Sequence, residues 1–138
     1  MDAAELRLGY RFSVIPRKKW TVLSAVLELK RGNREEISAL MGELNAKRRE
    51  KQPLEFPSAG STFKRPEGHF AGRLIEEAGL KGYRCGGAMV SEKHTGFVIN
   101  YDRATASDIY RLTCDIIDRV YEKSGIILER EIKLLGSF

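Results

Sequence analysis

Two stretches of the sequence carry side chains that could do chemistry. The first is the loop at residues 58–66, where small and hydroxyl residues precede the adjacent cations Lys64 and Arg65. Backbone N–H groups of such a loop, together with the cations, can approach a phosphate or a carboxylate closely. The loop lacks the G-x-x-x-x-G-K-[ST] pattern of a nucleotide-binding P-loop. On these residues alone, an anion contact is no better supported than an ordinary surface turn.

The second stretch is an expected last strand at residues 126–135. Strand alternation places Glu129, Glu131 and Lys133 on one face and the apolar side chains on the other. Two carboxylates beside a cation can take part in acid–base chemistry when burial raises the pKa of one of them. A solvated face with a cross-strand ion pair explains the same pattern and, on the residues alone, explains it better.

The histidines and cysteines do not point to a metal. His69 and His94 have no Cys, Asp or Glu neighbours at metal-ligand spacing, so we expect no zinc or iron site. His94 lies in a polar turn, where either contact with an anionic ligand or simple exposure to solvent fits. The only cysteines, Cys85 and Cys114, fit thiols in or near the core, which indicates reduced cysteines and a cytoplasmic protein.

Apolar periodicity predicts the elements that must position these residues. Asn33 with Glu36 has the spacing of a helix-starting capping box, and Thr105, with Asp108 three residues on, is expected to start another helix. Helices and strands alternate without a regular βαβ rhythm, which favours an α+β fold with a mixed sheet and three main helices. The expected elements are a strand at 20–30, a helix at 33–51, a helix at 71–78, strands at 84–90 and 96–101 joined by the turn 91–95, a helix at 105–125, and the strand at 126–135.

Composition narrows the class of protein without naming a function. The chain has 138 residues, 24 Lys and Arg against 19 Asp and Glu, and a net charge of +5. No apolar stretch is long enough to cross a bilayer, and the acidic start differs from a signal peptide. The positive charge fits a nucleic acid, an anionic lipid, a phosphorylated ligand or solubility alone. One alternative function is therefore a basic α+β nucleic-acid-binding module, although the aromatic residues follow no RNA-binding pattern.

A longer motif is far more specific. Residues 51–66 read K-Q-P-L-E-F-P-S-A-G-S-T-F-K-R-P. This run closely resembles the K-Q-P-L-E-[YF]-P-S-A-G-S-x-F-K-R-P signature of the UDP-N-acetylenolpyruvoylglucosamine reductases, in the shorter subtype of that family. The resemblance continues through residues 68–75, 78–84 and 86–94. Residues 8–13 match the family's G-Y-R-x-S, and residues 128–136 resemble its closing L-x-x-E-V-R-x-I-G.

The resemblance implies an NADPH-dependent flavin oxidoreductase of peptidoglycan synthesis, a cytoplasmic enzyme of cell wall biogenesis that supports cell shape and cell division. NADPH reduces FAD, and the flavin passes hydride to C3 of UDP-N-acetylglucosamine enolpyruvate, giving UDP-N-acetylmuramate. Ser61 matches the family's proton donor to C2, and Arg11 and Glu131 match the residues that stabilise the developing charge. The positions expected to bind substrate are Tyr10, Lys51, Arg65 and His94.

The resemblance also implies a division of the chain. Residues 1–32 match the last segment of the FAD-binding domain, and residues 33–138 match the C-terminal substrate-binding domain. The family's Gly-rich FAD-binding loops precede G-Y-R-x-S, so we expect FAD and NADPH sites in a further half, encoded in the same gene or as a separate chain. Alone, the chain is expected to be inactive without FAD, and to self-associate through the strand 20–30, with no nucleic-acid or membrane partner. Arg130 and Lys133 depart from the family's commoner residues, and Lys133 lacks the planar fork of arginine.

Overall fold

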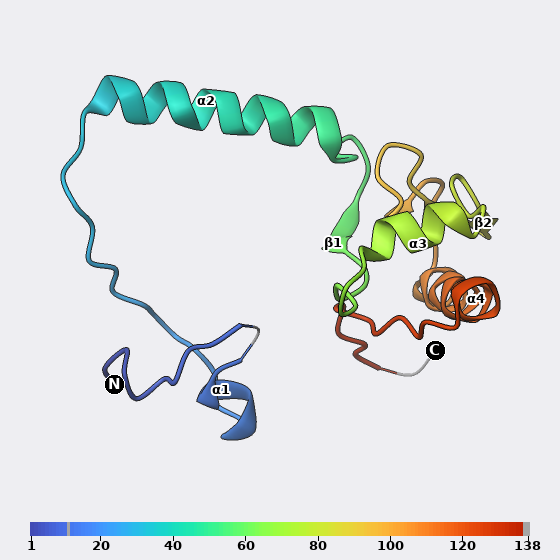
Figure 1. The fold of residues 1–138 in the computed structure, drawn as a ribbon, viewed down its shortest axis with the longest axis horizontal. Coiled ribbons are helices and arrows are strands. Elements are labelled where there is room, and N and C mark those ends of the chain that lie inside the picture. The colour runs from blue at the N-terminus through green and yellow to red at the C-terminus, as the bar shows by residue number, and fades with distance from the viewer. Residues whose placement is uncertain (11, 137–138) are drawn as a thin grey trace. The chain divides into compact units, whose positions relative to one another are not determined.

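The computed structural model describes residues 1–10 and 12–136 (Figure 1). Its contacts divide the chain into two units, Met1–Ile37 and Ser38–Phe138. The first unit holds the one-turn helix α1 (Val14–Arg17) and the start of α2 (Arg34–Lys51), which continues into the second unit. The other helices are α3 (Ala71–Glu77) and α4 (Ala106–Ser124). None of the described helices is long and apolar enough to cross a bilayer.

A four-stranded sheet forms the centre of the second unit. Its strands are β1 (Ser58–Ser61), β2 (Arg84–Cys85), β3 (Ala88–Val90) and β4 (Phe97–Asn100), in the order β1-β4-β3-β2. The expected α+β class with three main helices is confirmed, whereas the mixed sheet is wrong, because every described pair is antiparallel. The connections from β2 to β3 and from β3 to β4 are too short for the crossover that parallel strands require.

One face of this sheet carries the main core. In α4, Leu112, Ile116 and Val120 recur at every fourth position and are fully buried. They pack with inward-facing strand residues and with α3, so the amphipathic pattern of α4 matches the surface that it covers. The buried cluster comprises Phe63, Leu74, Ile75, Leu80, Ala88, Val90, Val98, Leu112, Ile116, Val120 and Leu128.

The opposite face of the sheet holds a smaller cluster. Met89, Phe97 and Ile99 are buried there, and the half-buried Phe56 packs against them. Because Phe56 belongs to the segment between α2 and β1, that segment covers part of this face. The face therefore carries an apolar floor with partial cover, which is the usual setting for a ligand pocket.

Both predicted helix starts are confirmed as capped. The Asn33 Oδ1 accepts hydrogen bonds from the backbone N–H groups of Glu35 and Glu36, at 2.8 and 3.3 Å. At α4, the Thr105 side chain and the Asp108 carboxylate each accept from the other residue's backbone N–H in a full capping box. Hydrogen bonds from Thr105 hold the pKa of Asp108 below its ordinary value.

Three strand predictions are wrong in whole or in part. Residues 20–30 have no regular secondary structure, and no strand of the described residues pairs with them. An alternating pattern sets only a local preference, and an extended segment needs a neighbouring strand for its backbone groups. Residues 126–135 form an isolated bridge between Phe63 and Arg130 instead of a strand, although even-numbered residues face inward up to Ile132, as predicted.

The expected strand 84–90 is a hairpin, with a turn at Gly86–Gly87 between β2 and β3. A Cβ at Gly87 would lie 2.1 Å from the Asp102 carbonyl oxygen, so only glycine fits this close approach. The sequence also gave no indication of β1, because its small residues are typical of turns.

Candidate functional site

The strand β1 presents Ser61 at an irregular point of the sheet. Ser58 pairs with Ile99 and Ser61 with Phe97, and the register shifts between the two pairs. Gly60 has a φ of +86°, a conformation that residues with a Cβ rarely adopt. Such bulges redirect side chains and often lie beside active sites. The glycine at position 60 therefore permits the bulge that sets the direction of the Ser61 side chain.

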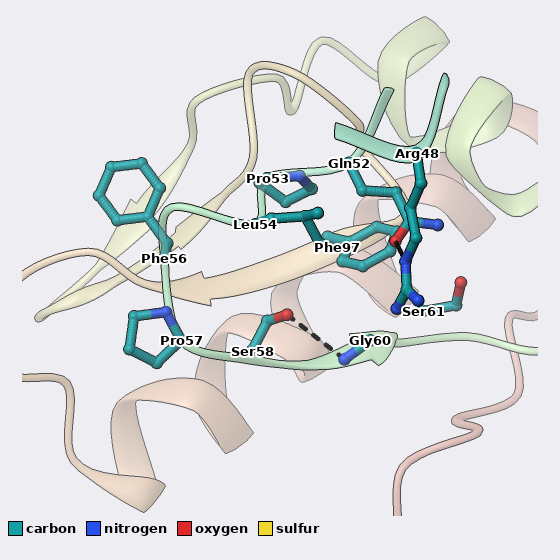
Figure 2. Close-up of a pocket in the computed structure, with 10 residues that line it drawn as sticks. All are labelled: Arg48, Gln52, Pro53, Leu54, Phe56, Pro57, Ser58, Gly60, Ser61 and Phe97. Carbon is teal, nitrogen blue, oxygen red and sulfur yellow. Dashed lines mark hydrogen bonds between the residues drawn. The ribbon is translucent and has the colours of Figure 1, made fainter. Parts of the chain in front are cut away.

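Ser61 lines an open pocket of about 490 Å³ (Figure 2). Prolines and the Leu54, Phe56 and Phe97 side chains provide apolar walls, while Arg48 and Gln52 from the end of α2 add polar groups. Arg48 Nε donates to Gln52 Oε1 at 3.1 Å, which orients the guanidinium within the pocket. The lining residues are Arg48, Gln52, Pro53, Leu54, Phe56, Pro57, Ser58, Gly60, Ser61 and Phe97.

Arg48 is the cation that the sequence analysis missed. It lies one turn before Gln52 on the same helix face, just ahead of the helix-ending Pro53. Lys51, the predicted substrate residue, ends α2 with an exposed side chain and is not among the residues that line this pocket. The four-residue spacing of Arg48 and Gln52 indicates that they share one helix face. Only the fold showed that this face borders the pocket.

Thr62, the residue after Ser61, anchors the site. It is almost fully buried, its N–H donates to the Gly96 carbonyl and its Oγ1 accepts from the Val98 N–H, both at 2.9 Å. The Thr62 carbonyl accepts from the Glu131 N–H at 2.9 Å. This last bond brings the backbone of Glu131 beside the Ser61 strand, across a long separation in sequence. The structure thus places two predicted catalytic residues on adjacent segments.

His94 lies in the turn that precedes β4. Its Nδ1 accepts from the Gly96 N–H at 3.0 Å, and its ring centroid is 5.0 Å from that of Phe97. Because Nδ1 is an acceptor, the neutral ring carries its proton on Nε2, which can donate to an anion or carbonyl. Phe97 pairs with Ser61, so the structure brings His94 to the neighbourhood of this pocket.

Arg65, another predicted substrate residue, is not among the residues that line this pocket. The Arg65 guanidinium stacks 4.0 Å from the Phe70 ring, and its Nε donates to the His69 carbonyl at 3.3 Å. Tyr10 belongs to the N-terminal unit and is exposed. Arg11 lies outside the described residues. Within residues 1–10 and 12–136, no group of three His, Cys, Asp or Glu side chains is arranged to hold a metal ion.

A second polar group of side chains lies on α4, around Tyr83. The Tyr83 hydroxyl donates to Asp115 Oδ2 at 3.2 Å and accepts from Arg119, whose guanidinium lies 4.3 Å from the Tyr83 ring. Burial and the Asp115 carboxylate raise the pKa of Tyr83. These contacts join the start of β2 to α4 and thus have a structural role.

Known proteins resemble this chain throughout its length. Residues 52–135 match the family model described as UDP-N-acetylenolpyruvoylglucosamine reductase, C-terminal domain. Reductases of that name from Lachnoclostridium phytofermentans and Streptococcus uberis are 56% and 55% identical over 136 residues, which is 99% of this chain. The matched regions are 44% and 45% of those relatives, so the chain spans less than half of their length.

A solved structure shows the same fold. The crystal structure of the UDP-N-acetylenolpyruvylglucosamine reductase from Thermus caldophilus matches with a TM-score of 0.67 and 38% identity. The match covers 93% of this chain and 46% of that protein.

Proposed function

The chain belongs to the family of UDP-N-acetylenolpyruvoylglucosamine reductases, and from this premise we propose that it forms the substrate-side, C-terminal part of such a reductase. In this proposal residues 33–138 make up the substrate-binding domain, and residues 1–32 belong to the FAD-binding domain. The substrate is UDP-N-acetylglucosamine enolpyruvate, reduced in the cytoplasm to UDP-N-acetylmuramate for peptidoglycan, with NADPH as the electron source.

One observation carries this proposal. Ser61 opens into a pocket that has an apolar wall and a cation, and the backbone of Glu131 is bonded to the residue beside Ser61. A hydroxyl and an arginine at one pocket, with a glutamate on the adjacent segment, suit a reaction in which charge develops on an anionic substrate and a carbon takes up a proton.

The residues of the site have different roles in this proposal. Ser61 donates a proton to C2 of the enolpyruvyl group, and Glu131 and Arg11 stabilise the enolate-like charge that makes C2 basic enough to accept it. Arg48 faces the pocket as an anion contact, a kind of role that the family resemblance implies for Lys51. His94 offers Nε2–H as a donor, while Tyr10 and Arg65 contribute further substrate contacts.

The residues described here do not suit a flavin site. A dinucleotide diphosphate is normally held by a Gly-rich turn between a strand and a helix N-terminus in a parallel sheet. The sheet of this chain is antiparallel in all described pairs, and its glycines serve hairpins and a bulge. In this family FAD supplies the hydride. We expect the residues that bind FAD to lie in the part of the relatives that this chain does not cover. A 138-residue polypeptide is thus expected to purify without flavin, and stoichiometric yellow flavin would contradict this.

A binding experiment tests the substrate assignment. Titration of the 138-residue chain with UDP-N-acetylglucosamine, followed by amide chemical shifts, should perturb β1 and the end of α2. An oligonucleotide of equal charge serves as the comparison ligand and should bind more weakly. Arg48→Ala should weaken the sugar nucleotide more than the matched Lys51→Ala. Tighter binding of the oligonucleotide would overturn the proposal in favour of a nucleic-acid-binding module.

A kinetic experiment tests Ser61. The chain is joined to the part of the L. phytofermentans reductase that it does not cover, and this chimera is studied by stopped flow. Ser61→Ala should leave flavin reduction by NADPH unchanged and slow flavin reoxidation by the enolpyruvyl substrate ~10²–10⁴-fold, as expected for a lost general acid. Ser61→Cys should retain more activity, because its thiol can still donate a proton. Equal slowing of both half-reactions, or of neither, would show that the role is wrong.

A further inference from the structure

The side chain of Arg130, next to Glu131, is directed into α4. Its Nε donates to Thr113 Oγ1 at 2.7 Å, its Nη2 donates to Cys114 Sγ at 2.9 Å, and its guanidinium lies 5.2 Å from the Tyr110 ring. The three partners occupy positions i, i+3 and i+4 of one helix face. One guanidinium thus binds a full turn of α4 from the segment that carries Glu131.

The acceptor at the centre of this contact is held in place. Thr113 is fully buried, and its hydroxyl donates to the Tyr110 carbonyl at 2.7 Å while it accepts from Arg130. A hydroxyl that donates in one direction presents its lone pairs in another. The position of the Arg130 donor is therefore set by the helix and does not follow the C-terminal segment.

The backbone on either side of Arg130 is bonded to the segment after Ser61. Phe63 and Arg130 form an antiparallel bridge, with hydrogen bonds from Lys64 N to the Glu129 carbonyl at 2.8 Å and from Glu131 N to the Thr62 carbonyl at 2.9 Å. In extended chain, neighbouring side chains point to opposite sides. With the Arg130 side chain on α4, Glu131 must face the other way. A slip of one residue would reverse this and direct Glu131 at the helix.

Apolar burial fixes the register of residues 128–132 less tightly than the hydrogen bonds of Arg130 do. Leu128 is buried on the same side as Arg130, and Ile132 is half-buried there. Their contacts are non-directional, so the segment could shift along its apolar surface at modest cost. The two hydrogen bonds of Arg130 to one helical turn are directional and tolerate little displacement.

We propose that Arg130 is a positioning residue, which acts through Glu131 by fixing the register that presents this carboxylate beside the Ser61 strand. The proposal rests on the catalytic role proposed above for Glu131. Arg130 itself faces α4 and has no contact with the substrate in this proposal.

The first test follows hydrogen exchange in the 138-residue chain. Arg130→Met keeps the length and apolar contact of the side chain but removes both hydrogen bonds, and should speed exchange of the Glu131 and Lys64 amides about tenfold, as expected for lost hydrogen bonds. The Val98 amide, bonded to Thr62 Oγ1, should keep its protection. Thr113→Val removes the acceptor of Nε without changing the segment and should also speed exchange of these amides, to a smaller extent because the bond to Cys114 Sγ remains. Unchanged exchange in both variants would overturn the proposal.

The second test measures kcat and KM in the chimera. Arg130→Met and Thr113→Val should each lower kcat about 10- to 100-fold, as small misplacements of catalytic groups do, with KM nearly unchanged. Arg130→Lys should recover part of the rate, since it keeps one donor but not the fork. The matched control is Arg119→Met, which removes another arginine–tyrosine stack of α4 without contact to this segment and should leave kcat unchanged.

Glu131→Gln in the same chimera separates the two proposals. A large loss of kcat in this variant together with normal kcat in Arg130→Met would overturn the positioning role alone. If Glu131→Gln retains normal kcat, the catalytic role of Glu131 is wrong, and the positioning of that residue for catalysis is wrong with it. The exchange experiment still reports in that case whether Arg130 fixes the segment.

Discussion

Residues 20–29 and helix α4 are both rich in large apolar side chains, yet the two regions differ completely in burial. Leu23 and Val26 are 94% and 99% exposed, whereas Leu112, Ile116 and Val120 in α4 are 0% exposed. The helix satisfies its own backbone and offers its apolar stripe to the sheet. The extended segment depends on other strands for both backbone pairing and burial. Apolar content alone therefore does not decide which region enters a core.

Helix α2 resembles α4 in its regular backbone and residues 20–29 in the exposure of its side chains. It forms over eighteen residues with a capped start, although none of its side chains is buried. Ile37, Leu40 and Met41, on its apolar stripe, remain about half exposed. A helix can thus form from local hydrogen bonds and capping before it has a partner, which a strand cannot do. The difference between α2 and residues 20–29 lies in backbone pairing, not in hydrophobicity.

The largest expected effect separates the core from the exposed segment. Ile116→Ala leaves a cavity at a fully buried position and should lower the free energy of unfolding by about 2–5 kcal/mol. Leu27→Ala, at a position 76% exposed, should change it by less than about 0.5 kcal/mol. Urea unfolding of the 138-residue chain followed by circular dichroism measures both. Equal losses would mean that residues 20–29 are buried in solution, and the contrast would fail.

The second prediction concerns what the exposed segment does in solution. Large apolar side chains gain about 1.5–3 kcal/mol each when they are buried, so this segment should drive self-association of the 138-residue chain. Sedimentation velocity should detect a dimer or larger species that disappears in the double variant Leu23→Lys, Val26→Lys. Lysines at the exposed positions Tyr121 and Ile127 add the same two positive charges and serve as the matched control. A wild-type chain that stays monomeric at high concentration would contradict this prediction.

A smaller effect on stability is expected when one glycine in each unit is replaced by alanine. Gly60→Ala introduces a Cβ at a φ of +86° and should destabilise the sheet by about 1–2 kcal/mol. At Gly32 a new Cβ would meet only the flexible end of the Ile37 side chain, at 3.0 Å, so Gly32→Ala should change stability by less than about 0.5 kcal/mol. Thermal unfolding measures both. If Gly60→Ala is as mild as Gly32→Ala, β1 adopts another conformation in solution.

The smallest expected effect is a pH dependence that distinguishes the two helix caps. The folded state lowers the pKa of Asp108 from 3.8, so its capping contribution is present above that value and is lost as the pH falls through the lowered pKa. The amide of Asn33, which caps α2, does not titrate. The stability difference between wild type and Asp108→Asn should shrink as the pH falls below 3.8, whereas that for Asn33→Ala should stay constant. A constant difference for Asp108→Asn would contradict the assigned cap.

The sequence was sufficient for elements whose interactions are local. Helices α2, α3 and α4 appear near their predicted bounds, because an i→i+4 ladder, a capping residue and a closing glycine or proline all lie within a few positions. The motif around Ser61 was equally accessible, since a family signature consists of consecutive residues. The burial alternation of residues 126–132 also follows from the sequence, as a period of two requires no knowledge of the partner.

Only the tertiary structure decided which of these pieces meet. The sequence could not show that β1 pairs with β4, that Arg48 rather than Lys51 lines the pocket, or that Glu131 bonds to Thr62. It also suggested strands at residues 20–30 and 126–135 that the described structure does not form. The physical reason is the same throughout. A helix finds its hydrogen-bond acceptors four residues away, whereas a strand or a binding pocket takes its partners from distant parts of the chain, where local pattern carries no information about register or contact.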